Sequence, residues 1–198
     1  MHVVVARVEV RREQHMRQGR IDTNLAYHAA RLIILLRFCG KPQNSTVSLP
    51  GILGRTLLAK LDFFLRYPAY LKRARELLRV HPLRQSTSLD VPETSSIESR
   101  MVRYLYGPWD HVYYPTLAYL IGKRLIQVEP RRQAEMFRLT DKGMAVAEKL
   151  VADSSYLELS ERARIVNALF HAYTGTGMKN FIYENFPEIV GRQIGETI

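Results

Sequence analysis

The sequence predicts a mainly helical protein that carries a small β hairpin, an α+β fold. Three observations lead to this expectation. Apolar residues recur at helical spacing in several long segments. Two short runs, "LIQVE" and "EMFRL", have the β-branched and aromatic content of strands and are joined by "PRRQA". Helix-capping residues stand on both sides of this pair of strands.

Basic residues are in large excess over acidic ones. The 198 residues include 29 Lys and Arg but 19 Asp and Glu, so the formal net charge is +10 at pH 7. An excess of this size favours a polyanionic partner, either nucleic acid or an acidic protein surface. A basic protein without such a partner is the alternative, and composition does not exclude it.

The chain has one cysteine, Cys39, and no long apolar run. A single cysteine cannot form an internal disulfide, so we expect a buried, cytosolic thiol. The apolar run 32–36 lies between Arg31 and Arg37 and is far shorter than the roughly 18–20 residues of a membrane helix. The first residues lack the apolar region of a signal peptide. We therefore expect a cytoplasmic protein that has no membrane partner.

Residues 1–85 form a predicted N-terminal helical lobe. It begins with a short strand, Val3–Val10, whose residues are mostly β-branched. The helix that follows starts after cap residues at 22–24 and ends at Gly40. This helix is apolar on nearly every side, so we expect it to be central, with His28 as a core or interface histidine.

A second pair of helices completes this lobe. We interpret residues 43–54 as a loop and Thr56 as the cap of the next helix. That helix has one apolar face at helical spacing, made of Leu57, Leu58, Leu61, Phe64 and Leu65. Pro68 disfavours helical geometry at the residue before it, so the chain bends there and a helix over 69–80 follows. The loop-like segment 81–96 is the expected boundary.

The second part, 95–152, begins with two predicted helices. Ser95 and Glu98 stand at capping-box spacing before the first helix, 97–109. Pro115 fits the first turn of the second helix. The apolar stripe of this second helix consists of Leu117, Leu120 and Ile121.

Two strands and three further helices complete the expected order. The strands cover 125–129 and 135–139, and Thr140 caps the helix after them. The tail, 153–198, contains two predicted helices. The first begins after Ser160, whereas the second follows "TGTG" and stops before a proline.

The second part resembles a winged helix-turn-helix domain over residues 95–152. The resemblance rests on "PTLAYLIGKRLI", a hairpin, and "FRLTDKGMAVAEKL". Its residues are Pro115, Thr116, Leu117, Tyr119, Leu120, Lys123, Leu125, Ile126, Phe137, Leu139, Thr140, Lys142, Gly143, Ala147 and Leu150. In such a domain the second helix of the pair enters the major groove, and the wing contacts the DNA backbone or minor groove.

Six residues are the predicted nucleic-acid contacts, from the polar face of the helix after Pro115 and from the wing tip: Thr116, Tyr119, Lys123, Arg124, Arg131 and Arg132. Paired arginines suit phosphate contacts, which carry no sequence information. The helix has no Asn or Gln to read base edges, so sequence-specific readout is not expected. There are two alternatives. The charges are solvated surface charges, or the domain docks on another protein, because winged helices serve as protein-docking modules as well as DNA-binding ones.

A wider resemblance covers residues 22–152. It is carried by Ala29, Arg31, Leu32, Leu35 and Leu36, and then by "GRTLLAKLDFFLRYP". These residues, followed by a winged helix, resemble the middle components of bacterial three-component ABC-ATPase systems, the group that includes Lamassu. Leu57 stands where that pattern has a basic residue, which weakens a direct DNA role for this turn.

The resemblance implies a non-enzymatic subunit of an anti-phage or anti-plasmid defence complex. Its partners would be an SMC-like ATPase and an effector, often a nuclease, with double-stranded DNA as a further partner. The subunit would bridge the other two and couple DNA sensing to effector control. The alternative is a winged-helix transcription regulator that binds an operator as a homodimer through its tail helices.

The residues themselves indicate no catalytic site. The six histidines are scattered at positions 2, 15, 28, 81, 111 and 171, without the spacing of metal ligands. We therefore expect no enzyme activity, no cofactor and no metal.

The helix that begins near Thr56 is the predicted docking surface. Its apolar face has to pack on the preceding helix first. Phe63, Arg66 and Tyr67 then remain for a protein partner, and Arg55 and Lys60 for an acidic surface or phosphate. We expect this helix mainly to bind a protein partner, and we expect any DNA contact to be made by the wing at Arg131 and Arg132.

Overall fold

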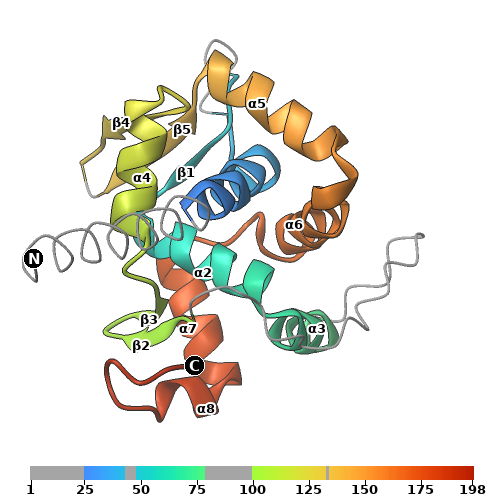
Figure 1. Cartoon of the computed structure of the whole chain (residues 1–198). Helices are drawn as coiled ribbons and strands as arrows, with labels where there is room; N and C mark the ends of the chain where they lie inside the picture. Colours follow the sequence, from blue (N-terminus) through green and yellow to red (C-terminus); the bar gives the residue numbers. More distant parts are fainter. Residues whose placement is uncertain (1–24, 43–47, 79–99, 133) are drawn as a thin grey trace, which may run out of the picture.

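The computed structural model of the chain describes residues 25–42, 48–78, 100–132 and 134–198. Within these ranges, helices pack around a three-stranded antiparallel sheet and a separate two-stranded hairpin (Figure 1). The expected mainly helical α+β class is confirmed. Four predicted features lie outside the described residues: the strand 3–10, the caps at 22–24, the loop-like segment 81–96, and Ser95 with Glu98.

The central helix is helical over residues 25–39, and its middle is fully buried. It ends where predicted, because the amide of Gly40 donates to the carbonyl of Leu36 at 3.0 Å. A Cβ at Gly40 would lie 2.4 Å from that same carbonyl oxygen, which is closer than any side chain tolerates. The close approach explains why glycine stands at this helix end.

The sheet has the order β1-β5-β4, built from β1 (Gly51–Leu53), β4 (Ile126–Pro130) and β5 (Glu135–Leu139). In register, Ile52 faces Phe137. The prediction of a loop over 43–54 is therefore wrong near its C-terminal end, where residues 51–53 form β1. A strand of three residues has no periodicity of its own, and its partner lies far along the chain. One sheet thus contains strands from both predicted parts, 1–85 and 95–152.

Helix α2 (Arg55–Arg66) follows β1 directly. Gly54, with φ of 86°, is its N-cap, so the predicted cap at Thr56 is wrong. The predicted break before Pro68 is confirmed, and α3 (Pro68–Leu77) begins there. The expected apolar face of α2 is buried, with Leu57 half-buried, but the opposite side is buried as well.

A hairpin stands where the sequence predicts a helix over 97–109. Strands β2 (Val102–Tyr104) and β3 (Gly107–Trp109) pair antiparallel. Gly107 takes a φ of 112°, and such a turn residue ends any helix. The C-terminal tail extends this small sheet, since the amide of Gly195 donates to the carbonyl of Arg103 at 2.7 Å.

The next elements follow the prediction closely. Helix α4 (Tyr113–Gly122) leads into β4 and β5, and α5 (Asp141–Ala152) follows. The predicted cap is confirmed, because the Thr140 hydroxyl accepts a hydrogen bond from the amide of Gly143 at 2.9 Å.

The tail forms a short 3-10 turn, Ser154–Tyr156, and then α6 (Leu157–Phe170). The predicted start after Ser160 is wrong by one helical turn. Helix α7 (Gly175–Asn185) begins inside "TGTG", capped by the Thr174 hydroxyl, and α8 (Pro187–Val190) follows. No helix in the described ranges is both long and apolar enough to span a membrane.

An aromatic cluster joins the tail to α2. The Phe64 ring lies 4.6 Å from that of Phe170 and 5.8 Å from that of Phe186, between ring centroids. Phe181 completes the cluster at 5.5 Å from Phe170. Helix α2 therefore packs against the tail, and Asp62 of α2 is also hydrogen-bonded to Arg31 of the central helix; nearly all of α2 is buried.

Replacing Gly143 by alanine is expected to destabilise the fold by about 1–3 kcal/mol or more. A Cβ at this position would lie 1.9 Å from the carbonyl oxygen of Leu125, which is backbone and cannot move aside. Urea unfolding followed by circular dichroism measures the effect. Gly122→Ala is the matched control: nothing lies within 4 Å of its Cβ, so a gain of up to about 1 kcal/mol is expected. Equal losses in the two variants would contradict this packing.

Candidate functional site

The outer face of α4 is apolar. Five of its residues are exposed, and none carries a charge or an amide: Tyr114, Pro115, Ala118, Ile121 and Gly122. The exposed fraction is 55% for Tyr114 and 44% for Ile121. Exposed large apolar side chains gathered on one helix face are typical of a surface that another protein covers.

Two of the predicted nucleic-acid contacts on α4 are turned inward. Thr116 is fully buried, and its hydroxyl donates to the carbonyl of Val112 at 2.7 Å. Its assignment as a DNA contact is therefore wrong. Tyr119 is half-buried, and the Lys123 ammonium lies 5.6 Å from the centroid of its ring.

Lys123 and Arg124 are exposed at the turn between α4 and β4. Arg124 has a φ of 57°, in the left-handed region that arginine rarely adopts. Two contacts from the start of α5 hold this turn. The Thr140 hydroxyl donates to the Arg124 carbonyl at 2.7 Å, and the Lys142 ammonium donates to the Lys123 carbonyl at 3.1 Å. The two cationic side chains are left on the outer surface.

The wing arginines, Arg131 and Arg132, are exposed just after β4. The Arg131 guanidinium pairs with Glu129 at 2.5 Å, and Arg138 reaches the same carboxylate at 2.8 Å. The hydrogen bond from Arg138, together with that from Arg131, holds the pKa of Glu129 below its ordinary value. Part of the charge of Arg131 is therefore neutralised locally. Exposed cations thus stand at both ends of β4.

The predicted partner surface on α2 is mostly interior. Phe63 is fully buried, Lys60 is 1% exposed, and the Arg66 side chain is 3% exposed, so these three assignments are wrong. Tyr67 is half-buried, and its hydroxyl accepts a hydrogen bond from the Met101 amide at 2.9 Å. Arg55 is exposed, but it pairs with Glu135 at 2.9 Å. The hairpin and the tail cover the faces of α2 that were predicted to be exposed and available to a partner.

A buried polar network anchors the first turn of α4. Asp62 accepts bonds from the Arg31 guanidinium at 2.7 and 3.2 Å and from the Tyr113 hydroxyl at 2.7 Å. Burial, followed by the nearby Asp62 carboxylate, raises the pKa of Tyr113 well above its ordinary value. Arg66 pairs with Asp110 at 2.7 Å, just before α4. The central helix and α2 thus fix the position of α4 through charged hydrogen bonds.

The same network also involves His28, whose ring nitrogen Nδ1 lies 2.8 Å from the Arg31 guanidinium. His28 is 1% exposed, which confirms its expected place in the core.

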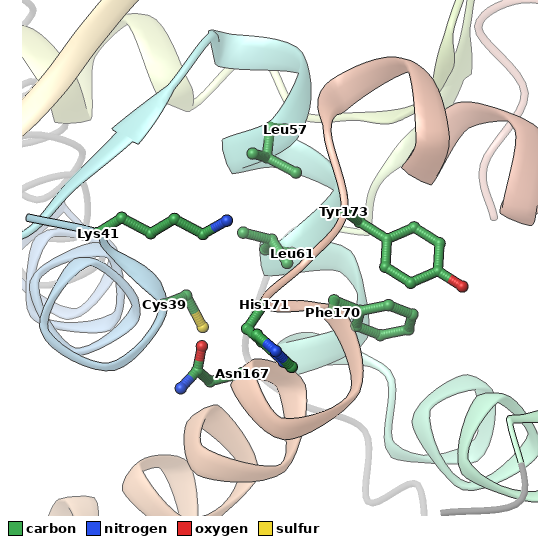
Figure 2. Close-up of a pocket in the computed structure, with 8 residues that line it drawn as sticks. All are labelled: Cys39, Lys41, Leu57, Leu61, Asn167, Phe170, His171 and Tyr173. Carbon is green, nitrogen blue, oxygen red and sulfur yellow. The ribbon is translucent and has the colours of Figure 1, made fainter. Parts of the chain in front are cut away.

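A small pocket lies between the central helix, α2 and the end of α6 (Figure 2). Its volume is about 20 Å³, room for about one water molecule. The Cys39 thiol lies beside it, is buried as predicted, and donates to the Ala163 carbonyl at 3.6 Å. Burial raises the pKa of this thiol well above its ordinary value, so the reactive thiolate is disfavoured. The pocket does not have the dimensions of a substrate site.

Within the described ranges, no group of three or more His, Cys, Asp or Glu side chains is placed to hold a metal ion.

The sequence-based prediction does not assign the exposed apolar residues of α4 and of the β2–β3 hairpin to a binding surface, and it places Ile121 in the buried stripe of α4. Tyr114, Ala118 and Ile121 recur at spacings of four and three, which is a second helical stripe beside the buried one. That spacing was a usable signal for α4. For the hairpin no such spacing was recognised. Its segment was predicted to be a helix, so its exposed turn was not expected.

No family model, no curated protein and no solved structure matches the chain.

Proposed function

We propose that the chain is a non-catalytic winged-helix subunit that docks on a partner protein through the outer face of α4. The order of elements supports the winged-helix assignment: the central helix, β1, α2, α4 and the β4–β5 hairpin, with the sheet order β1-β5-β4. Helix α3 and the β2–β3 hairpin are insertions between α2 and α4 in this interpretation.

The observation that carries the proposal is the composition of the outer face of α4. A helix that reads DNA presents Arg, Lys, Asn or Gln side chains to base edges. The exposed residues of α4 offer rings, methyl groups and glycine instead. Burial of such side chains against another protein is favourable, at about 25 cal/mol for each Å² of apolar surface removed from water.

The partner follows from the resemblance of residues 22–152 to middle components of three-component ABC-ATPase systems. The subunit bridges an SMC-like ATPase and an effector in a cytoplasmic defence complex against phage or plasmids. Its cations at the ends of β4 supply contact with double-stranded DNA that the complex senses. Such phosphate contacts give affinity without sequence preference.

Size-exclusion chromatography with light scattering tests this function. The full chain is expected to elute as a monomer alone and with the SMC-like ATPase subunit when the two are mixed. Ile121→Asp is expected to weaken the complex at least about tenfold, because it buries an unpaired carboxylate at the interface. Leu157→Asp changes a side chain that is 55% exposed on α6, and it is the control that leaves the complex intact.

A DNA-binding homodimeric regulator is the second candidate, and the exposed Lys123, Arg124 and Arg132 favour it. In that case the chain alone elutes as a dimer, ignores the ATPase and protects one palindromic DNA site. That result would contradict the docking proposal.

A further inference from the structure

The turn of the β2–β3 hairpin exposes large apolar side chains. The exposed fractions are 41% for Tyr104, 53% for Leu105 and 60% for Tyr106. A water-facing turn usually carries polar residues and glycine, so this composition is unusual for its position. The hairpin is also held firmly, since the Tyr183 hydroxyl of α7 donates to the Leu105 carbonyl at 2.8 Å.

Trp109 joins this turn to the outer face of α4. Its ring centroid lies 6.1 Å from that of Tyr104 and 5.9 Å from that of Tyr114. Figure 1 shows the hairpin and α4 on the same side of the molecule. We call these exposed and half-buried side chains the aromatic strip; its members are Tyr104, Leu105, Tyr106, Trp109, Tyr114 and Ile121.

The charge around the aromatic strip has one sign. Residues 100–126, which form the hairpin and α4, contain four basic residues and one acidic residue. The acidic one, Asp110, is buried and paired with Arg66. Arg100 is exposed before the hairpin, and Lys123 and Arg124 are exposed after α4, so the exposed charges of this stretch of chain are positive.

A carboxylate from the tail also comes near the hairpin, but it is already paired. The backbone carbonyl of Glu196 accepts a bond from the Arg103 amide at 2.8 Å, and the Glu196 carboxylate pairs with Arg192 at 2.9 Å. The exposed charge contributed by residues 100–126 therefore remains positive.

We propose that the aromatic strip binds an acidic amphipathic helix of a partner protein. Apolar side chains of that helix cover the strip, and its carboxylates meet the exposed cations of residues 100–126. This inference rests on the proposed docking function and specifies the partner surface that α4 and the hairpin bind together. The hairpin is a binding element in its own right.

A protein helix fits the strip better than single-stranded nucleic acid does. Bases stack on open ring faces. Here the Trp109 ring packs against the rings of Tyr104 and Tyr114, and the aliphatic Leu105 and Ile121 add surface that has no ring face. Aliphatic side chains give a base no face to stack on, but they pack well against Leu or Phe of a helix.

Trp109 provides the measurement, because it is the single tryptophan of the chain and lies within the strip. The probe is a synthetic amphipathic peptide of about 18 residues, roughly five helical turns, with Leu and Phe on one face and Glu on the other. Its addition to the full chain is expected to shift Trp109 emission, with an affinity that falls as salt rises. The same peptide with Lys in place of Glu is expected to leave the emission unchanged.

Tyr106→Asp is expected to weaken peptide binding about tenfold, a loss of about 1.4 kcal/mol, because it places a carboxylate where the acidic peptide lies. Leu157→Asp, away from the strip on α6, is the control and keeps wild-type affinity. The inference is overturned if the acidic and basic peptides bind alike, if Tyr106→Asp binds as well as wild type, or if oligo-dT alone shifts the emission.

These results separate this inference from the proposed function. Suppose that the ATPase complex is weakened by Ile121→Asp but not by Tyr106→Asp, and that the peptide does not change Trp109 emission. The proposed role of the aromatic strip is then overturned, and the docking function stands. The absence of any ATPase complex overturns the docking function itself.

Discussion

Asp62→Ala is expected to lower the free energy of unfolding by about 3–5 kcal/mol. Asp62 is fully buried and accepts hydrogen bonds from the Arg31 guanidinium and the Tyr113 hydroxyl. Removing the carboxylate leaves a buried guanidinium without its counter-ion, and this costs far more than the intact pair contributes. Urea unfolding, followed by Trp109 fluorescence, measures the loss.

Two further variants test the cause. Glu148→Ala removes the exposed partner of Arg37, an ion pair of the same 2.7 Å length at the surface, and is expected to cost at most about 1 kcal/mol. The double variant Arg31→Met with Asp62→Leu removes both buried charges and is expected to recover part of the stability. Losses of equal size for Asp62→Ala and Glu148→Ala would contradict the importance of the network.

The network also has a functional consequence. Tyr113 begins α4 and Asp110 stands just before it, so the network sets the direction in which the outer face of this helix points. Asp62→Asn retains one acceptor and is expected to fold, yet to dock more weakly than wild type. Weaker docking of a folded variant separates a positioning role from a purely structural one.

Lys60→Met is expected to stabilise the protein at neutral pH. Lys60 is 1% exposed, and its ammonium has a carbonyl acceptor, that of Thr56, at 3.4 Å. Burial, followed by repulsion from Lys179, lowers the pKa of Lys60 from 10.5 to about 7. Because a tenfold change in proton affinity corresponds to about 1.4 kcal/mol, the buried charge costs on the order of 5 kcal/mol.

The pH dependence of this gain has a definite sign. The unfolded chain binds the proton more tightly than the folded protein does, so the free energy of unfolding rises with pH between about 7 and 10.5. The advantage of Lys60→Met is therefore expected to shrink by about 3 kcal/mol between pH 7 and pH 10. Lys149→Met, at an exposed position of α5, is the control with a constant effect. The same profile for both variants would contradict a buried, destabilised ammonium at Lys60.

Local signals predicted a good part of the fold. Gly40 ends the central helix, Pro68 separates α2 from α3, and Thr140 caps α5, as the sequence indicates. Each signal acts through hydrogen bonds or sterics within one turn of chain, so no knowledge of the tertiary structure is needed. The two wing strands were also found, because five residues of β-forming character stand on each side of a short turn.

Elements that depend on distant partners were missed. Strand β1 has three residues and pairs with β5, and the β2–β3 hairpin packs against α2 and the tail. Neither contact leaves a periodic pattern in the sequence. The burial of Phe63, Lys60 and Arg66 was missed for the same reason. The elements that cover these faces of α2 are the hairpin and the tail, which lie far along the chain.

Hydropathy assigned the sides of α4 only in part: Leu117 and Leu120 are buried as expected, but two other residues are not where the pattern placed them. Ile121 was expected inside and Thr116 outside, but Ile121 is 44% exposed and Thr116 is fully buried. The buried side follows Tyr113, whose hydroxyl has to reach Asp62.

The central claim is that the outer face of α4 meets protein, while DNA contact is left to the cations beside it. Photocrosslinking tests it most directly, with a benzoylphenylalanine in place of Ala118, which is exposed in the middle of that face. The chain is irradiated with the SMC-like ATPase, the effector and double-stranded DNA all present. A covalent adduct to one of the protein subunits is the predicted result. An adduct to DNA instead would contradict the claim.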